Sequence, residues 1–358
     1  MSISGNLFSM NRRGIGKTGR AAHGTQGRWA RWFRRSTKLY LLLVLALWLL
    51  LHLGADRWWP ATLILFGPRW VFALPLLLLA PLAFRLDRSQ LLWLGAAAAV
   101  IFIPFMGLRV PLSRKGADGA TIRVLTCNVG GPDMDRESLA RLIRESDADI
   151  VALQECARET ALKALPGWTL VTEERLVVAA RVPVTRAQGR RIMHPPRQWP
   201  RASALQCVVH LPEGDLTFSS IHLPSPRQGL SNMLDRKRLL NLANVPLLKK
   251  ETELRRRTAE EIEALLRPGA LPAVVAGDFN MPVESAWYRR FWPAYSNAFS
   301  KAGFGYGFTE KIVLRGFEYR VRIDHILTRG DLVAERCWIG MDVGSDHLPL
   351  LAEIRRSR

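Results

Sequence analysis

The sequence predicts an α/β domain that is preceded by transmembrane helices. Nearly uninterrupted apolar segments lie within residues 37–110, and a membrane-spanning helix requires about 20 apolar residues. From residue 120 onward, short apolar runs rich in β-branched residues alternate with amphipathic helical patterns and turn residues. The 358 residues are enough for one large domain in addition to the hydrophobic region.

The positive charge is concentrated at the N-terminus. The formal net charge is +20, and the first 38 residues hold nine Lys or Arg and no Asp or Glu. Residues 118–358 hold 35 basic and 29 acidic residues, a net of +6 (35 − 29). This distribution is typical of a cytoplasmic tail beside a membrane, and it argues against a domain that binds nucleic acid through charge alone. Residues 1–36 lack apolar periodicity and are expected to form a basic, disordered cytoplasmic tail.

The hydrophobic region contains three apolar segments, at residues 39–55, 70–84 and 91–108. The first and third are long enough to cross a bilayer, whereas the middle segment is shorter and contains Pro75 and Pro81. Three crossings would place the following domain on the extracytoplasmic side of the inner membrane, and a re-entrant middle segment would leave it in the cytoplasm. We expect three. A cleavable signal peptide is disfavoured because two further apolar segments follow the first.

The four cysteines stand apart from one another, with no CxxC spacing and no Cys/His cluster. Zinc binding is therefore not expected. Buried free thiols are favoured over disulfides, and the spacing alone does not define a connectivity.

Strands and helices alternate after the hydrophobic region. Residues 135–146 are expected to form an amphipathic helix because their apolar side chains fall on one face, and residues 255–266 form a second helix. Apolar runs bounded by turn residues predict strands at 121–127, 150–154, 176–182, 204–211, 216–223, 273–276, 322–327 and 351–354.

Polar residues that can bind a metal or move a proton follow several of these strands. A buried strand is expected to end in turn residues, yet these end in a carboxylate, an amide or an imidazole. Strand ends gathered at one edge of a sheet are where α/β proteins assemble their sites. The residues concerned are Asn128, Glu155, His222, Asp278, Asn280, Asp324, Asp346 and His347.

The segments around these residues resemble, in order and spacing, the endonuclease/exonuclease/phosphatase superfamily. Gly277-Asp278-Phe279-Asn280 and Ser345-Asp346-His347 carry most of the resemblance, which covers about residues 120–356. It implies that residues 118–358 form a catalytic domain with a four-layered αββα sandwich of two mainly antiparallel sheets. It also implies hydrolysis of phosphate esters with Mg²⁺ or Mn²⁺, hard cations that prefer carboxylate and amide oxygens.

The resemblance assigns metal binding to three of these positions. Glu155 matches the family's principal metal ligand, Asn128 lies beside it, and Asp346 stands where some members supply a further ligand. Asp324 and His347 resemble the family's Asp–His pair, in which the carboxylate fixes the ring's tautomer and raises its basicity.

The water-activating base is either His347 or Asp278, and the sequence leaves both open. Asn280 resembles the amide that positions a phosphate oxygen. His222 matches a proton donor or phosphate ligand in some branches, with a satisfied core histidine as the alternative. His325 is expected to be structural and is left outside the site.

The sequence thus predicts a membrane-anchored, divalent-metal-dependent phosphoesterase. Its partners would be membrane lipids and a phosphate-ester substrate, which is a lipid head group, a small molecule or a nucleic acid; no obligate protein partner is expected. A nuclease acting on DNA or RNA and a catalytically silent membrane scaffold remain as alternatives. Residues 224–253 include six basic residues, which form either a lid over an anionic head group or a solvated helix face.

Overall fold

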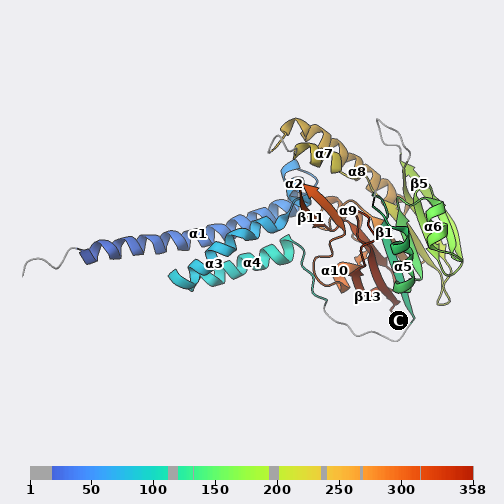
Figure 1. Ribbon diagram of the computed structural model, residues 1–358, viewed down its shortest axis with the longest axis horizontal. Coiled ribbons are helices and arrows are strands. Elements are labelled where there is room, and N and C mark those ends of the chain that lie inside the picture. Colours follow the sequence, from blue (N-terminus) through green and yellow to red (C-terminus); the bar gives the residue numbers. More distant parts are fainter. Residues whose placement is uncertain are drawn as a thin grey trace, which may run out of the picture. The chain divides into compact units, whose positions relative to one another are not determined.

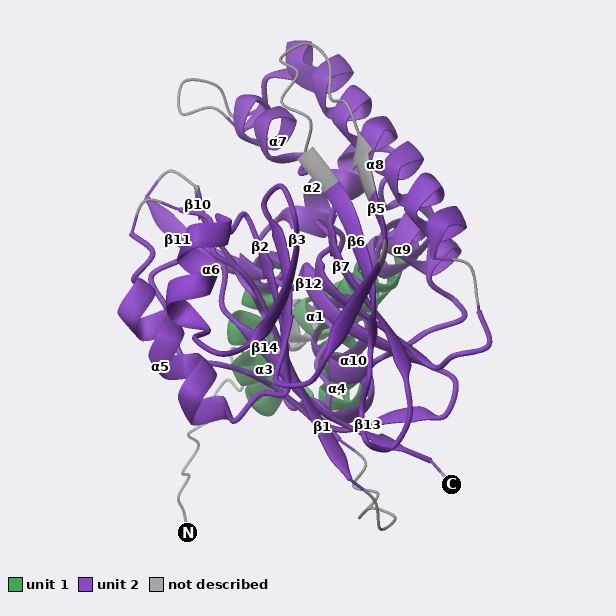
Figure 2. Ribbon diagram, turned by 90° about the vertical axis from the view of Figure 1, so that its right-hand side faces the viewer, with its two compact units in different colours: residues 1–46, 72–101 green, residues 47–71, 102–358 purple. Residues whose placement is uncertain are grey.

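The computed structural model of the protein describes residues 18–111, 120–131, 133–192, 201–234, 240–266, 269–314 and 316–357. The chain divides into two compact units (Figure 2). Unit 1 consists of Met1–Ala46 and Phe72–Ile101, and unit 2 consists of Leu47–Val71 and Phe102–Arg358. The second unit therefore includes a segment that lies between the first two hydrophobic stretches of the sequence.

Unit 1 is built from apolar helices. They belong to α1 (Thr18–Gly54), α3 (Leu74–Leu86) and α4 (Gln90–Val100), and a 3₁₀ turn (Arg69–Ala73) and a π turn (Ile101–Phe105) adjoin α3 and α4. Residues 18–36, expected to be disordered, are helical in α1, and residues 1–17 of the expected tail lie outside the described residues.

Many large apolar side chains of these helices face outward. Leu42, Leu78 and Leu92 are 62%, 72% and 80% exposed. By length and composition, Arg28–Gly54 and Arg69–Leu86 are each able to cross a membrane, and Gln90–Phe105 is a shorter apolar helix. Exposed apolar surface of this extent is unfavourable in water and is typical of an interaction with a membrane or a partner.

Unit 2 is a sandwich of two mixed sheets (Figure 1). The first sheet has the order β13-β14-β1-β2-β4-β3 and the second the order β5-β6-β7-β8-β12-β9. In each, one parallel pair, β1–β2 or β7–β8, lies among antiparallel pairs. The strands of the first sheet are β1 (Thr121–Asn128), β2 (Ile150–Gln154), β3 (Thr169–Glu173), β4 (Leu176–Ala180), β13 (Leu332–Ile339) and β14 (Leu350–Arg356). Those of the second are β5 (Val184–Ile192), β6 (Arg201–Val209), β7 (Leu216–His222), β8 (Ala273–Asp278), β9 (Ser296–Asn297) and β12 (Asp324–Arg329).

Helices cover the outer faces of the sheets (Figure 2). Leu139 and Leu142 of α5 pack with Val151 of the first sheet, and Ile262 of α8 packs with Val275 of the second. A third apolar cluster fills the space between the sheets, so the unit has four layers. Its helices are α2 (Trp59–Phe66), α5 (Arg136–Ser146), α6 (Arg158–Ala164), α7 (Arg227–Met233), a 3₁₀ turn (Leu242–Asn244), α8 (Val245–Leu265), α9 (Ala286–Phe291) and α10 (Ala298–Ala302). A separate hairpin is formed by β10 (Glu310–Leu314) and β11 (Phe317–Val321). The four cysteines are buried and free.

A buried ion pair ties residues 47–71 to the sandwich. Nη2 of Arg255, on α8, donates to Oδ1 of Asp56 at 2.6 Å, and both side chains are fully buried. The hydroxyl of Ser285 donates to the other Asp56 oxygen. A buried carboxylate is tolerated only when its charge is paired and its lone pairs accept hydrogen bonds. The loop that carries Asp56 therefore belongs to the fold of unit 2.

Arg255→Met should lower the free energy of unfolding by about 3–5 kcal/mol, because it leaves the Asp56 carboxylate buried without its cation. Arg257→Met is the matched control: it removes an exposed pair with Glu253 and should cost less than about 1 kcal/mol. Denaturant unfolding of the full chain in detergent measures both. Equal stability of the two variants would show that the buried pair does not hold the Asp56 loop.

Candidate active site

The two parallel strand pairs deliver polar residues to one place. In the first sheet, β1 ends at Asn128 and β2 ends at Gln154, directly before Glu155. In the second sheet, β7 ends at His222 and β8 ends at Asp278, and these two residues are register partners. Because parallel strands end at the same edge of a sheet, each pair brings two functional side chains together.

Asp324 differs from the expectation that each polar residue lies at the C-terminal end of its strand. It is the first residue of β12, which begins two residues later than expected. β12 runs antiparallel to β8 and places Asp324 opposite Asp278. The start of one strand and the end of the other therefore meet at the same edge. The direction of β12 depends on its pairing partner and is not encoded in its own residues.

Asp278 is the centre of the cluster. Its Oδ2 accepts hydrogen bonds from Nδ2 of Asn128 (3.1 Å) and of Asn280 (3.0 Å), and its Oδ1 accepts one from the Asn280 backbone N–H (2.8 Å). Asn280 Nδ2 also donates to the Leu223 carbonyl at 2.8 Å. Both amide hydrogens of Asn280 thus position Asp278 and its turn. Burial, and next the Asp324 carboxylate, raise the pKa of Asp278 to about 6.

His347 and Asp324 form the expected pair. His347 Nδ1 lies 2.8 Å from Asp324 Oδ2, and its Nε2 lies 3.9 Å from Asp278 Oδ2. All three side chains are buried. Burial by itself would lower the pKa of His347, but the Asp324 and Asp278 carboxylates outweigh burial and raise that pKa well above its usual value. The raised pKa favours the protonated imidazole, whose Nδ1 donates to Asp324.

The same three residues satisfy the geometry of a metal cluster, since one ligand atom of each lies within 4.8 Å of the others. The contacts of His347 argue that these three residues have a use other than metal binding. Nδ1 of His347 is engaged by Asp324, and a protonated ring has no lone pair for a metal. As arranged, the cluster suits proton transfer and contact with an anion. A metal would bind here only with loss of the imidazole proton.

Glu155 and Asn128 present oxygen atoms at a second position. Glu155 has a left-handed backbone (φ +55°), which turns the chain sharply after β2. A Cβ built on Gly130 would lie 2.8 Å from Glu155 Oε2 and 3.1 Å from Asn128 Oδ1, so both oxygens face this glycine. The Glu155 side chain is 33% exposed. The Asn128 oxygen also accepts a hydrogen bond from the Gly130 backbone N–H at 2.9 Å. Carboxylate and amide oxygens are the donors that Mg²⁺ or Mn²⁺ prefers, and this pair fits such an ion.

His222 lies between the two positions. Its Nε2 is 3.5 Å from Asp278 Oδ2 and 3.8 Å from Glu155 Oε1. The ring therefore faces the carboxylates of the site, unlike that of a histidine satisfied within the core.

Asp346 lies at the rim and has a different partner. Its Oδ2 accepts a hydrogen bond from Arg227 Nη1 at 3.0 Å, and the Asp346 side chain is 31% exposed. The Lys311 backbone N–H donates to its carbonyl at 2.8 Å. The structure brings Asp346 to the site but pairs its carboxylate with Arg227. A role as a metal ligand would require that pair to open.

Glu310 is a site residue that the sequence analysis missed. It makes an isolated β-bridge with His347 and is buried. Burial raises the pKa of Glu310 to about 7. It begins the β10–β11 hairpin, which packs beside the sandwich. No strand pattern or motif in the sequence pointed to this hairpin.

Two hydroxyl groups brace the cluster. Ser345 Oγ lies 2.8 Å from the Asn128 carbonyl and 2.7 Å from the Gly130 carbonyl. Thr309 Oγ1 accepts a hydrogen bond from the Asp324 backbone N–H at 3.1 Å. Ser345 belongs to a motif recognised in the sequence, but its bracing contacts could not be read from its position there.

His325 has the structural role that was expected. Its Nε2 lies 2.8 Å from the Met281 carbonyl, and its Nδ1 lies 3.2 Å from Asn297 Nδ2. Complete burial lowers the pKa of His325 to about 3. The ring is therefore neutral, donating from Nε2 and accepting at Nδ1.

Comparison with known proteins identifies the family. A crystal structure of an endonuclease/exonuclease/phosphatase family protein from Bacteroides thetaiotaomicron is 16% identical and covers 68% of this chain and 100% of its own, with a TM-score of 0.49. The structure of D. rerio TDP2 complexed with single strand DNA product is 15% identical and covers 66% and 99%, with a TM-score of 0.48. The B. thetaiotaomicron mannosyl-6-phosphatase is 16% identical and covers 65% and 99%, with a TM-score of 0.47. No curated protein matches the chain.

Residues 125–347, more than half of the sequence, match the Endonuclease/Exonuclease/phosphatase family. The protein belongs to this family and is a hydrolase of phosphoesters.

Proposed function

We propose that the protein is a membrane-anchored, divalent-metal-dependent phosphodiesterase or phosphatase whose catalytic domain spans residues 118–358. The observation that carries the proposal is the buried carboxylate of Asp278, which contacts residues from both sheets and lies between two histidines. A buried carboxylate with a raised pKa beside two histidines is typical of a functional site. A catalytically silent scaffold would have no need to keep this arrangement.

The metal would be held by Glu155 and Asn128, with Asp346 joining when Arg227 releases it. Mg²⁺ or Mn²⁺ at this place supplies positive charge to the phosphoryl oxygens. Arg227, whose side chain is 63% exposed and now pairs with Asp346, would be the cation that contacts a phosphate oxygen when this pair opens.

Of the two candidate bases, Asp278 is the one we favour. With a pKa of about 6 it is mostly ionised at neutral pH and would accept the proton of the attacking water. The Asp324 and Asp278 carboxylates raise the pKa of His347, which favours a role for this residue as hydrogen-bond donor to a phosphate oxygen. Asn280 holds Asp278 in place, and His222 lies where it can donate to the leaving oxygen or to the phosphate.

Contacts within each unit support three membrane crossings. Asp56, in the loop after α1, is buried against Arg255 of the sandwich, so that loop and the catalytic domain lie on the same side of a membrane. At the other end of α1, Arg34 pairs with Asp87 in the α3–α4 loop at 2.6 Å. From Arg34 to Gly54, α1 rises about 30 Å, which is the thickness of a bilayer's hydrocarbon core. With the basic tail in the cytoplasm, the domain is extracytoplasmic.

Glu155→Gln should reduce metal-dependent hydrolysis of bis(p-nitrophenyl) phosphate by more than about hundredfold, because it removes a charged metal ligand. The thermal transition of the Glu155→Gln variant should stay near that of the parent chain. Glu159→Gln, an exposed change in the first turn of α6, is the control and should retain full activity. Equal activity of the two variants would contradict the assignment of Glu155.

The rate should fall on the acidic side of about pH 6. Protonation of Asp278 removes the base, so kcat/KM should drop about tenfold per pH unit below its pKa and stay level between pH 7 and 8. Asp278→Asn should lower kcat/KM by at least about a hundredfold at pH 7 and abolish the acidic limb. Measurements at saturating metal for each pH test this; an acidic limb that persists in Asp278→Asn would assign it to another group.

An alkaline-phosphatase fusion after Val110 tests the topology. Because alkaline phosphatase folds only outside the cytoplasm, where its disulfides form, the fusion should be active if the chain crosses three times. A fusion after Asp87, in the α3–α4 loop, should be inactive. The reverse result would place the catalytic domain in the cytoplasm.

A further inference from the structure

An apolar groove borders the catalytic cluster. Asn280 and Glu310 line it, as does Arg227, so it reaches the residues around Asp278 and His347. The rest of its lining is mainly apolar. We call it the inner groove, defined by Phe66, Leu230, Leu234, Ile312, Val313 and Tyr319.

One wall of the inner groove comes from the loop after the first hydrophobic helix. Phe66 is the last residue of α2 and is 3% exposed. The Arg255 guanidinium lies 5.3 Å from the centre of its ring. Since Arg255 also holds the buried Asp56, the ion pair and the aromatic contact fix this wall against α8. A segment next to the membrane helices is thereby built into the substrate site.

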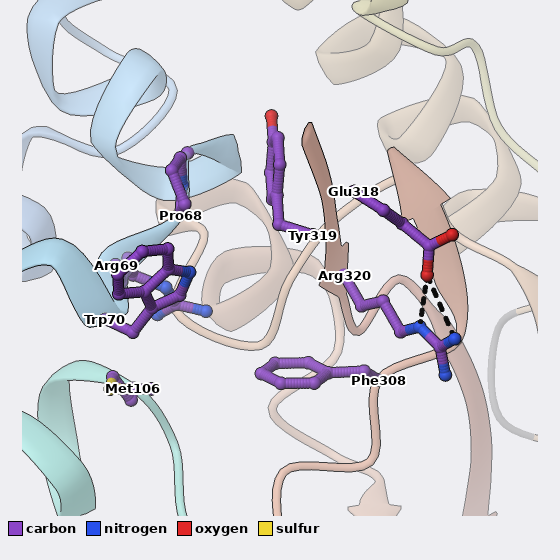
Figure 3. A pocket seen from close by; sticks show the side chains of 9 residues that line it. Pro68, Arg69, Trp70, Met106, Phe308, Glu318, Tyr319 and Arg320 are labelled. Carbon is purple, nitrogen blue, oxygen red and sulfur yellow. Dashed lines mark hydrogen bonds and ion pairs between the residues drawn. The ribbon is translucent and has the colours of Figure 1, made fainter. Parts of the chain in front are cut away.

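A second cavity of about 260 Å³ adjoins the ends of the hydrophobic segments. Figure 3 shows Arg69 and Trp70 on one side of it and Phe308 on the other. Tyr319 lines both this cavity and the inner groove. Met106, directly after the apolar helix Gln90–Phe105, also lines it. Arg69, at the start of the second candidate span, lines this cavity, and Tyr319 separates it from the inner groove beside the catalytic cluster.

Apolar side chains are exposed around the same region. Val313 is 67% exposed and Phe317 is 51% exposed, both on the β10–β11 hairpin. Phe317 lies 5.6 Å from Trp70, which is 37% exposed, and Trp58 is 52% exposed. Tryptophan and other apolar residues at the ends of membrane helices are typical of the interface between lipid and water.

We propose that the inner groove binds the hydrocarbon chain of a membrane lipid whose phosphate ester is cleaved at the catalytic cluster. This inference rests on the proposed phosphoesterase function and names its substrate class. Arg227 lines the groove beside the catalytic cluster, where the phosphate of such a lipid would need a cation, and the apolar side chains extend from the same place. The chain enters from the bilayer past Trp70 and Tyr319. A sugar phosphate or a nucleotide would leave the apolar wall unused.

The test uses p-nitrophenyl phosphate diesters that carry a methyl, butyl or octyl group, assayed with the full chain in detergent and Mg²⁺. Each methylene buried in the groove should raise kcat/KM about threefold to fourfold until the groove is filled. The butyl ester should therefore exceed the methyl ester by about tenfold or more. Leu230→Ser and Ile312→Ser should each reduce this butyl-to-methyl ratio severalfold.

Leu162→Ser is the matched control. Leu162 is 47% exposed on α6, remote from the inner groove, and this variant experiences the same partitioning of substrate into detergent. It should keep the parent ratio. A ratio near one in the parent chain, or equal ratios in Leu230→Ser and Leu162→Ser, would overturn the inference. Thermal unfolding confirms that each variant is folded, and two groove variants guard against the failure of one.

Three further measurements separate the possible failures. If the methyl ester is cleaved and Glu155→Gln abolishes that cleavage, the phosphoesterase function holds whatever the chain length shows. Calorimetry of methyl and butyl phosphonate binding compares the affinity of the groove for the two chain lengths without turnover. Proteoliposomes containing phosphatidylglycerol test the source of the chain: cleavage of soluble esters with no cleavage of a bilayer lipid would overturn the membrane as the source.

Discussion

The hydrogen bond from Asn128 to Asp278 joins the two sheets at the point where chemistry is proposed to occur. Each residue ends a strand of the one parallel pair in its sheet, and the antiparallel strands on either side hold that pair in register. Ser345, in the loop that carries His347, donates a hydrogen bond to the Asn128 carbonyl and holds it in place. The separation between the metal position and the base is therefore set by the packing of two sheets. Preorganisation of this kind is what allows electrostatic interactions to contribute to catalysis.

Asp278, Asp324 and His347 lie in one buried cluster, where burial and their mutual interactions shift the pKa values of Asp278 and His347. The Asp324 carboxylate raises the pKa of its partner His347, and by repulsion it adds to burial, the larger cause, in raising the pKa of Asp278. One carboxylate thus shifts the pKa of both the proposed phosphate contact and the proposed base. Neither shift would exist if the cluster were open to water, because solvent would screen both interactions.

The sequence indicated which polar residues end the strands more readily than it indicated the contacts around them. Strand ends such as Asn128 and Asp278 were recognisable because a polar residue directly after a buried apolar run has few structural explanations. The strand at Leu332–Ile339 was not recognised, since its polar and apolar residues show no clean alternation. Glu310 was missed because its importance comes from tertiary burial beside His347. The Asp56–Arg255 pair joins residues 199 positions apart, and no local pattern encodes such a contact.

That last contact has a consequence for how the chain is divided into modules. A conventional description would treat the hydrophobic region as an anchor and the sandwich as an independent enzyme. Here the loop between two hydrophobic helices carries both a buried counter-ion, Asp56, and a wall residue, Phe66. Exchanging the hydrophobic region for that of another protein, or cutting the chain after it, would remove both residues from the enzyme. The segment between the hydrophobic helices therefore has to be kept with the sandwich in any shortened form of the protein.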